Sequence, residues 1–329
     1  MPRELKTLTP IFLFSLPRAG STLVQRILGS HDDIVTISEP WVLLPYLYAL
    51  KEGGIYTEYD HRSAKAALTD FCEEFPKGKD DYFEELREFT LSLYTKAARG
   101  SGKYFLDKTP RYHLIVEEIF QLFPEGKFIF LWRNPLSIIA SMLDTWGQGQ
   151  WRLYRRKVDL FTGLANLCQT YEKYCDHVGV VNYETLLINP KKELKPIFEY
   201  LALPFDAEIL QNFDHVQLKG QMGDPTGVKN YKAISQTPLN KWENILNNPI
   251  RKAWCKGYLE WIGKERLALM GYNINELIYE LNQIPSTPRF LLSDAFGISY
   301  GAMRCVLEPQ MFKRKMQAIN SWHELHEHG

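Results

Sequence analysis

Long apolar runs, a net charge and a cysteine framework are all absent from this 329-residue sequence. No stretch of about 18 or more apolar residues occurs, so the sequence predicts no membrane-spanning helix. Lysine and arginine together number 39 and are balanced by 39 aspartates and glutamates. The chain therefore lacks the broad basic surface typical of nucleic-acid-binding proteins, and we expect no nucleic-acid partner. A site for an anion must be built from a few local residues.

The cysteines and the N-terminal sequence indicate a cytoplasmic protein. The five cysteines are odd in number and include no Cys-x-x-Cys pair. They are expected to be reduced thiols, not a disulfide framework or a zinc site. No cluster of carboxylates and histidines has the spacing of metal ligands, so we expect no bound metal. The first ten residues also lack the apolar core of a signal peptide.

Four short apolar runs predict buried strands. They cover residues 11–16 (IFLFSL), 104–106 (YFL), 128–132 (FIFLW) and 178–183 (VGVVNY). Runs that are apolar on both faces suit a parallel sheet with helices on each side. Helical patterns follow the first three runs at residues 21–30, 111–123 and 135–146. This alternation predicts an α/β domain with a central parallel sheet flanked by helices.

The remaining chain is mainly helical in pattern, over residues 40–99, 150–177 and 189–282. No repeat or break in composition divides it, so we expect one domain over residues 1–285 and a C-terminal extension over residues 286–329. Residues 309–326 resemble an amphipathic helix. The extension could be a cap, a dimer element or a surface anchor, and the oligomeric state is open.

The first strand is followed by a loop and helix start with the composition of an anion site. Residues 15–23 (SLPRAGSTL) place small residues and two hydroxyls where free backbone N–H groups and the helix dipole attract an anion. Arg18 adds a forked cation. The loop resembles the phosphate-binding P-loop, but Gly20 stands where that motif has lysine. The alternative is an ordinary N-capped helix after a tight turn.

A second arginine stands at the end of the third predicted strand. Arg133 directly follows that strand, and Asn134-Pro135 then opens a helix in the favoured capping order. Ser141 lies eight residues after Arg133, about two helical turns further on. Together they could hold a dianionic phosphate where open α/β sheets bind ligands. Taken alone, Arg133 could instead form a salt bridge with a neighbouring loop.

The two motifs together resemble those of sulfotransferases that use 3′-phosphoadenosine 5′-phosphosulfate (PAPS). Residues 17–23 (PRAGSTL) look like the loop for the 5′-phosphosulfate, and residues 133–141 (RNPLSIIAS) look like the 3′-phosphate site. The likeness extends over about residues 11–269 and implies a P-loop-NTPase-like fold. It also implies PAPS as co-substrate and 3′,5′-adenosine bisphosphate (PAP) as product. The implied nucleotide-binding residues in these motifs are Arg18, Ala19, Gly20, Ser21, Thr22, Arg133 and Ser141.

The resemblance also implies catalytic residues. Glu39 stands 21 residues after Arg18, as does the catalytic glutamate of tyrosylprotein sulfotransferases after their loop arginine. A carboxylate there could accept the acceptor's proton, or it could simply stabilise a helix start. Lys108 resembles the lysine that neutralises the leaving phosphate oxygen, and Arg18 assists it. His113 lies too far from Lys108 to match the histidine base of cytosolic sulfotransferases; we expect it half-buried in a helix and keep it as a reserve base.

Two further segments resemble the nucleotide site. Tyr183 matches a family tyrosine near the nucleotide, although a tyrosine after a strand also packs well without a ligand. Gly227, Val228 and Lys229 lie in a polar loop, residues 219–237, which resembles the mobile loop over the nucleotide. A solvated loop would have the same composition. The densest basic cluster, residues 151–157 (WRLYRRK), could guide an anionic acceptor or contact an acidic membrane, but we expect a solvated helix face.

The resemblance therefore implies a PAPS-dependent sulfotransferase acting on an acceptor hydroxyl. A P-loop kinase and a non-catalytic nucleotide-binding protein are the alternatives. The missing P-loop lysine speaks against the kinase, and Glu39 with Lys108 favours an enzyme. The acceptor is open: a glycan, a lipid-linked glycan, a carrier-bound acyl chain or a phenol. Aromatic residues of the long insertion could form an acceptor wall or a core; they are Trp41, Tyr46, Tyr48, Tyr56 and Tyr59.

Overall fold

A computed structural model describes residues 8–51, 61–218 and 233–307. These residues form a five-stranded sheet in the order β2-β3-β1-β4-β5, in which all neighbouring strands are parallel. The strands are β1 (Thr9–Phe14), β2 (Ile34–Thr36), β3 (Tyr104–Asp107), β4 (Lys127–Trp132) and β5 (Gly179–Asn182). After β1 the chain forms β2 and β3 on one side of that strand, and it then crosses to form β4 and β5 on the other side. The junction of β1 and β4 is thus the place where such sheets bind ligands.

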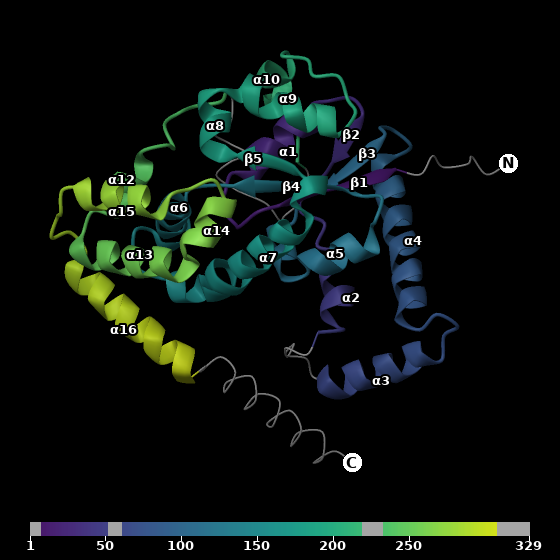
Figure 1. The fold of residues 1–329 in the computed structure, drawn as a ribbon, viewed down its shortest axis with the longest axis horizontal. Helices are drawn as coiled ribbons and strands as arrows, with labels where there is room; N and C mark the ends of the chain where they lie inside the picture. The colour runs from purple at the N-terminus through teal and green to yellow at the C-terminus, as the bar shows by residue number, and fades with distance from the viewer. Residues whose placement is uncertain (1–7, 52–60, 219–232, 308–329) are drawn as a thin grey trace, which may run out of the picture.

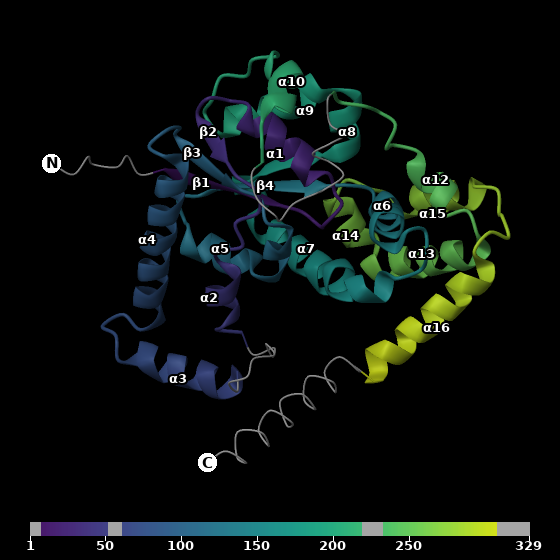
Figure 2. The same ribbon diagram turned by 180° about the vertical axis from the view of Figure 1, so that it is seen from behind.

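Helices cover both faces of the sheet (Figure 1). On one face lie α1 (Ser21–Gly29), α8 (Tyr183–Ile188) and α9 (Pro190–Tyr200), with α10 (Ile209–Asn212) and the short η5 (Phe213–His215) beyond. On the other lie α5 (Val116–Leu122) and α7 (Leu164–Tyr174), and Figure 2 shows the same division from behind. The 3₁₀ helix η1 (Pro110–Leu114) precedes α5, and the 3₁₀ helix η2 (Leu153–Arg156) and the π helix η3 (Val158–Gly163) precede α7. The 3₁₀ helix η4 (Cys175–His177) lies between α7 and β5.

The remaining helices form two groups at the ends of the sheet. The helices α2 (Leu44–Tyr48), α3 (His61–Glu73) and α4 (Lys79–Ala98) extend away from it beside β3 (Figures 1 and 2). The second group lies around α6. It comprises α6 (Pro135–Gly147), α12 (Lys241–Ile245), α13 (Pro249–Ile262), α14 (Lys264–Leu269), α15 (Ile274–Gln283) and α16 (Leu291–Leu307).

Aromatic side chains fill the space between the sheet and α5. Phe12 and Phe14 point to the same face because they are two residues apart on one strand. Phe128 on β4 stacks beside both of them, with ring centroids 6.0 and 6.3 Å away. Phe120 of α5 covers Phe128 at 3.8 Å. Burial of these rings fixes the central strands, and therefore the positions where their C-terminal ends leave the sheet.

The predicted fold class is confirmed, and four of the strands lie where apolar runs predicted them. The fifth, β2, was not predicted, because three residues at the sheet edge are too few to give a pattern. The predicted helix over 111–123 is also wrong in detail. It divides at Ile115 into η1 and α5, since Asp107 and Asp159 hold the first turn in a tighter geometry, as described below.

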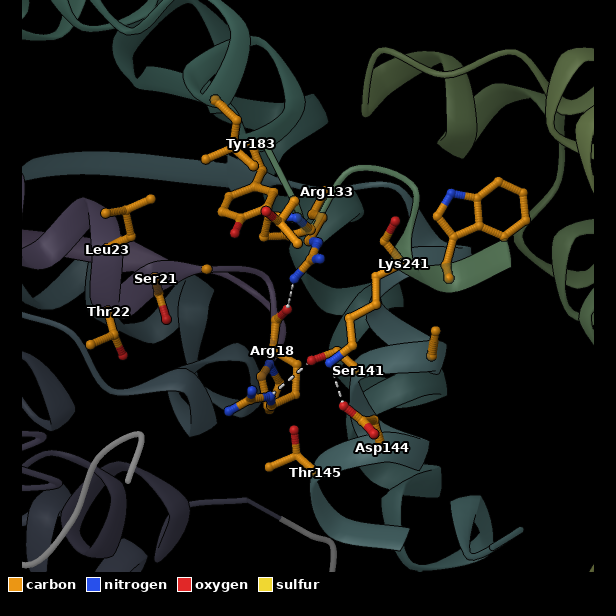
Figure 3. Close-up of a pocket in the computed structure, with 18 of the residues that line it drawn as sticks. Arg18, Ser21, Thr22, Leu23, Arg133, Ser141, Asp144, Thr145, Tyr183 and Lys241 are labelled. Carbon is orange, nitrogen blue, oxygen red and sulfur yellow. Dashed lines mark hydrogen bonds and ion pairs between the residues drawn. The ribbon is translucent and has the colours of Figure 1, made fainter. Parts of the chain in front are cut away.

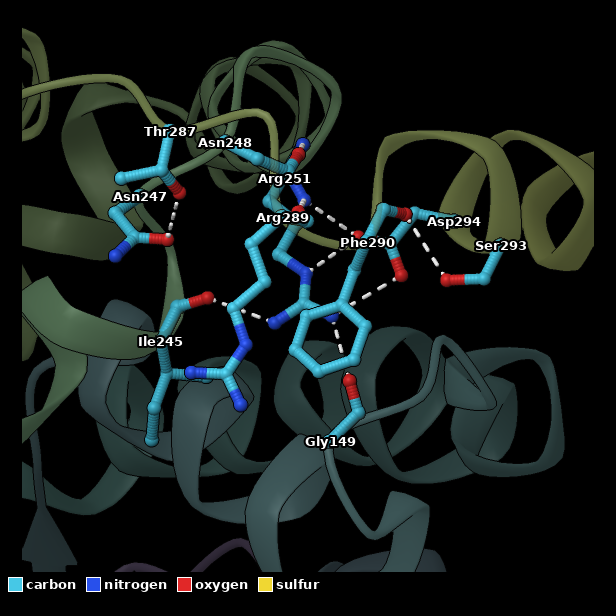
Figure 4. Close-up of polar contacts among 10 residues, drawn as sticks. All are labelled: Gly149, Ile245, Asn247, Asn248, Arg251, Thr287, Arg289, Phe290, Ser293 and Asp294. Atoms are coloured by element: carbon cyan, nitrogen blue, oxygen red, sulfur yellow. Dashed lines mark hydrogen bonds and ion pairs between the residues drawn. The ribbon is translucent and has the colours of Figure 1, made fainter.

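A buried ion pair joins α16 to the rest of the molecule (Figure 4). The Asp294 carboxylate accepts hydrogen bonds from Arg251 Nε at 2.6 Å and Arg251 Nη2 at 3.0 Å. Asn248 Nδ2 also donates to Asp294 at 2.6 Å, and Arg251 Nη2 donates to the Gly149 carbonyl oxygen at 2.6 Å. Both charged side chains are almost fully buried, at 3% and 0% exposed. This pair fixes the start of α16 against α13 and the end of α6.

We expect Asp294→Ala to lower the free energy of unfolding by about 3 kcal/mol, because it leaves the buried Arg251 charge without its carboxylate. Chemical denaturation measures the change. The matched control is Asp144→Ala, since Asp144 pairs with Lys241 on the surface, where both side chains are about half exposed. That control should cost less than about 1 kcal/mol. Equal losses in the two variants would contradict a stabilising role for the buried pair.

Candidate active site

A cavity of about 550 Å³ opens at the C-terminal ends of the strands, beside the junction of β1 and β4. Residues from both arginine motifs line it (Figure 3). The lining includes Pro17, Arg18, Gly20, Ser21, Thr22, Glu39, Lys108, Pro110, Arg133, Ser137, Ser141, Thr145, Trp146, Tyr183, Lys241 and Trp242. The cavity thus brings together segments that are more than 200 residues apart in the sequence.

The loop after β1 turns sharply before it enters helix α1, and its residues line the cavity. Arg18 has a φ of 70° and Gly20 a φ of 96°, and both values lie in the left-handed region. Between them Ala19 is buried, and its N–H donates to the Leu16 carbonyl oxygen at 3.2 Å. Helix α1 starts at Ser21, where the first N–H groups have no partner within the helix. A non-glycine residue in this conformation is costly, and such strain is characteristic of ligand-binding loops.

Gly20 leaves room for the ring of Tyr183. A Cβ atom at position 20 would lie 2.2 Å from Tyr183 Cε2 and 2.5 Å from Cδ2. Tyr183 itself is 1% exposed, at the start of α8, so its ring has little space to withdraw. The contact of Gly20 with Tyr183 therefore sets how closely the loop after β1 approaches the start of α8.

We expect Gly20→Ala to destabilise the protein by about 2 kcal/mol or more, because it adds a clash to a left-handed backbone. It should also weaken ligand binding in the cavity. The matched control is Gly257→Ala in α13, where a Cβ would meet nothing within 4 Å. Alanine there should raise stability by up to about 1 kcal/mol. Denaturation curves for both variants measure the difference, and equal stabilities would show that the close approach is unimportant.

Arg133 connects the second motif to the first. Its Nη1 donates to the Arg18 carbonyl oxygen at 2.7 Å, and its guanidinium carbon lies 4.4 Å from the centre of the Tyr183 ring. Its buried Nε has no hydrogen-bond partner among the described residues. Ser141, two turns into α6, accepts a hydrogen bond from Arg18 Nε at 3.1 Å. The two predicted anion motifs therefore share one wall of the cavity and contact each other directly (Figure 3).

The backbone around Arg133 is held from behind by Glu184. The Asn134 side chain caps α6 by accepting from the Leu136 N–H at 2.9 Å. The Asn134 N–H in turn donates to Glu184 Oε1 at 3.1 Å. The Tyr272 hydroxyl donates to the other Glu184 oxygen. These contacts fix the start of α6 and hence the direction in which Arg133 leaves β4.

Glu39 and Lys108 meet in the cavity. Lys108 Nζ donates to Glu39 Oε1 at 2.8 Å, and the two side chains are only 2% and 11% exposed. Trp41 Nε1 donates to the other carboxylate oxygen, Oε2, at 3.1 Å. This last contact could not be predicted from the sequence, because it accompanies a left-handed turn at Trp41, which has a φ of 58°. An acid and a cation are thus in direct contact beside the loop after β1.

Strand β2 places Glu39, three residues beyond its end. Gln25 of α1 donates to Thr36 Oγ1 at 2.8 Å and to the Ile37 carbonyl oxygen at 2.7 Å. Thr36 Oγ1 donates to the Leu106 carbonyl oxygen at 2.8 Å. The strand missed by the sequence patterns is therefore the element that holds the carboxylate opposite the loop after β1.

Asp107 organises the segment that carries Lys108. This fully buried carboxylate accepts hydrogen bonds from the hydroxyls of Tyr94 at 2.6 Å, Thr109 at 2.8 Å and Tyr112 at 3.0 Å. Burial raises the pKa of the Asp107 carboxyl to about 6, and these donors act in the opposite direction. The network fixes the turn between β3 and η1, which Thr109 directly precedes.

His113 does not line the cavity. Its Nε2 faces Asp159 Oδ1 at 2.9 Å, and the expectation of a half-buried histidine is wrong, because the side chain is 1% exposed. It lies in the 3₁₀ helix η1, and burial lowers its pKa. Gly163 of the π helix packs against the ring, where a Cβ would come within 2.6 Å of Nδ1. The contacts of His113 thus join η1 to η3.

The predicted loop residues Gly227, Val228 and Lys229 lie outside the described residues. The chain returns to the cavity after them, where Lys241 and Trp242 contribute to its wall. Lys241 Nζ forms an ion pair with Asp144 Oδ2 at 2.6 Å (Figure 3). Tyr56 and Tyr59 of the long insertion are likewise outside the described ranges. Of its other aromatic residues, Tyr48 packs against the core and Tyr46 is 41% exposed.

Comparison with known proteins identifies the family. A family model described as "Sulfotransferase family" matches residues 10–207, which include both arginine motifs, Glu39 and Lys108. The chain belongs to the sulfotransferase family.

Relatives of this sulfotransferase come from bacteria and animals. Nodulation protein NoeE of Sinorhizobium fredii is 37% identical over 150 residues, covering 45% of this chain and 34% of NoeE. Protein-tyrosine sulfotransferase of Drosophila melanogaster is 22% identical over 77% of this chain and 47% of its own length. The chain thus spans a third to a half of these two relatives. A solved sulfotransferase domain from the Synechococcus PCC 7002 olefin synthase shares the fold, with 24% identity, a TM-score of 0.51, and coverage of 74% of this chain and 90% of that domain.

Two further observations concern metal binding and membrane-spanning helices. Within the described ranges, no three histidine, cysteine or acidic side chains are grouped in a way that could bind a metal ion. None of the helices in that part of the chain is both long and apolar enough to traverse a bilayer. The cysteines described there, Cys72, Cys168, Cys175 and Cys255, are free thiols.

Proposed function

We propose that this sulfotransferase transfers the sulfuryl group of PAPS to a hydroxyl of an acceptor molecule. The observation that carries the proposal is the direct contact between two anion-binding motifs in one cavity, through Arg133 and the Arg18 carbonyl oxygen and through Arg18 and Ser141. PAPS carries anionic groups at both ends of its ribose. The loop from Arg18 to Thr22 would bind the 5′ side, and Arg133 with Ser141 the 3′-phosphate.

Glu39 and Lys108 supply the chemistry in this proposal. The acceptor oxygen attacks sulfur, the bond from sulfur to the bridging phosphate oxygen breaks, and Glu39 takes the acceptor's proton. Lys108 neutralises the negative charge that grows on the departing oxygen, so the products are the sulfate ester and PAP. The two side chains also neutralise each other, because they form an ion pair at 2.8 Å. Binding of donor and acceptor would separate this pair. Lys108 would then contact the bridging oxygen of PAPS, and Glu39 the acceptor hydroxyl.

The other parts of the proposal follow from the same cavity. Tyr183 would pack beside the nucleotide, and Gly227, Val228 and Lys229 would close over it. The acceptor would be a glycan, a lipid-linked glycan, a carrier-bound acyl chain or a phenol. His113 remains the reserve base. We also propose a transferase domain over residues 1–285 and an extension from residue 286, tied to it through Asp294.

The kinase alternative is not favoured, because Gly20 stands where a P-loop lysine would contact the terminal phosphates. The non-catalytic alternative is tested by the formation of a sulfated product from labelled PAPS.

Thermal unfolding with PAP, ADP and ATP tests the donor site. A ligand at about 100 times its dissociation constant adds about 2.7 kcal/mol to the stability of the native state. We expect this stabilisation with PAP at a concentration where ADP and ATP have little effect. Stabilisation by ATP or ADP alone would indicate a phosphotransferase, and no response to any of the three would contradict a nucleotide site.

A further inference from the structure

Trp146, at the C-terminal end of α6, connects the cavity with a second cationic segment. Its indole lines the cavity, and the Arg18 guanidinium carbon lies 5.8 Å from its ring centre. The Arg156 guanidinium carbon lies closer to the ring, at 4.0 Å. At this distance a guanidinium stacks on an indole, which leaves its N–H edge available for a bidentate contact.

The segment that carries Arg156 presents a solvated face, as expected, because Arg152, Arg155 and Lys157 are exposed, but two of its other residues anchor it in the core. Trp151 and Leu153 are each only 4% exposed. Trp151 packs edge-on against Trp254 with ring centroids 5.1 Å apart. The buried side chains of Trp151 and Leu153 thus fix the backbone at the start of this segment.

The Arg156 guanidinium forms no ion pair with a carboxylate of the described residues. It makes no hydrogen bond or ion pair with any residue in the described ranges, although it is half-buried. Burial lowers the pKa of the Arg156 guanidinium, the Asp159 carboxylate raises it, and Arg111 and Arg155 lower it. Asp159 is itself engaged by Arg111 at 3.2 Å and by His113 at 2.9 Å. Positive charge therefore exceeds negative charge beside Trp146.

A small cavity of about 40 Å³ marks the place where this charge collects. Trp146, Arg152, Arg155 and Arg156 line it, together with the end of α6. Arg152 donates to Gln150 at 2.6 Å, and Arg155 donates to the Tyr154 hydroxyl at 3.3 Å, so neither is neutralised by a carboxylate. Like charges on three arginines that line one hollow repel one another, and an anion beside them would relieve this repulsion.

We propose that Arg156, stacked on Trp146, binds a carboxylate or phosphate group of the acceptor. The inference rests on the proposed function and specifies its substrate class: a hydroxyl compound with an anionic group. Such a molecule would place its anionic group beside Arg156 in the small cavity and reach past Trp146, which lines both cavities, so that its hydroxyl lies in the cavity of Glu39. The forked guanidinium suits both oxyanions, because each presents two oxygens in one plane to its N–H groups.

A matched pair of probes tests this subsite in the protein saturated with PAP. The probes are 4-hydroxybenzoate and its uncharged analogue 4-hydroxybenzamide, titrated calorimetrically. We expect the carboxylate to bind about tenfold more tightly than the amide, equivalent to about 1.4 kcal/mol. Arg156→Gln should reduce this preference to less than about twofold. Lys157→Gln, which removes the same charge from an exposed neighbour, should keep it.

Equal affinities of the two probes, no binding of the carboxylate at millimolar concentration, or a preference that survives Arg156→Gln would each overturn the inference. So would a loss of binding to phosphatidylserine vesicles in Arg156→Gln without any probe preference, since that result would assign the arginine to a membrane surface. Stabilisation of Arg156→Gln by PAP, equal to that of the parent, shows that the variant is folded. If PAP does not bind the parent, the proposed function fails, and the same probe comparison without PAP still decides the subsite.

Discussion

Replacing Arg133 with alanine is expected to weaken PAP binding about 1000-fold, or by about 4 kcal/mol. The variant loses a forked, charge-assisted contact with a dianionic phosphate. It also loses the Nη1 hydrogen bond to the Arg18 carbonyl oxygen, so the loop after β1 loses a support. Calorimetric titration with PAP measures the change, and product formation from PAPS should fall at least as far.

The controls for this prediction separate charge from geometry. Arg133→Lys keeps the charge but not the fork and should recover only part of the affinity. Arg289→Ala removes an exposed arginine that does not line the cavity, and it should bind PAP as the parent does. PAP binding by Arg133→Ala with parental affinity would show that the 3′-phosphate does not bind at this motif.

Replacing Glu39 with glutamine is expected to lower kcat by about 100- to 10,000-fold while PAP binding stays close to the parental value. Glutamine has the same shape and keeps one oxygen, which can accept from Lys108 or from Trp41, but it cannot take a proton at the acceptor hydroxyl. Glu39→Ala should lose as much turnover, and it also leaves the buried Lys108 without its partner. Steady-state rates with labelled PAPS and calorimetric PAP affinities measure the two effects separately.

Glu117→Gln is the matched control, because Glu117 makes an exposed ion pair with Lys173 outside the cavity. It should retain full turnover. Unchanged turnover in both Glu39 variants would contradict the assignment of the base. The role would then pass to His113, which would have to leave its contact with Asp159.

The sheet could be predicted from the sequence because its central strands are apolar on both faces, as at Phe12 and Phe128. Arg18, Arg133 and Ser141 could be predicted as neighbours for a topological reason: parallel strands place their C-terminal ends at one edge of the sheet. The sequence also placed Lys108 at a strand end, where the structure shows it beside Glu39.

Features that depend on tertiary contacts could not be predicted. The edge strand β2 is too short for an alternating pattern, yet it positions Glu39. The contact of Gly20 with Tyr183 joins residues 163 positions apart. The stack of Arg156 on Trp146 depends on the burial of Trp151 and Leu153, which a local composition of mostly basic residues conceals.

The direct link between the two arginine motifs has a kinetic consequence for the proposed reaction. Arg133 supports the loop that carries Arg18, so the two ends of a bound nucleotide are held as one unit and must be released together. PAP retains both phosphate groups after the sulfuryl group has left. The spent donor therefore keeps most of the contacts of the fresh one, and its departure, not the transfer itself, is expected to set the pace of turnover.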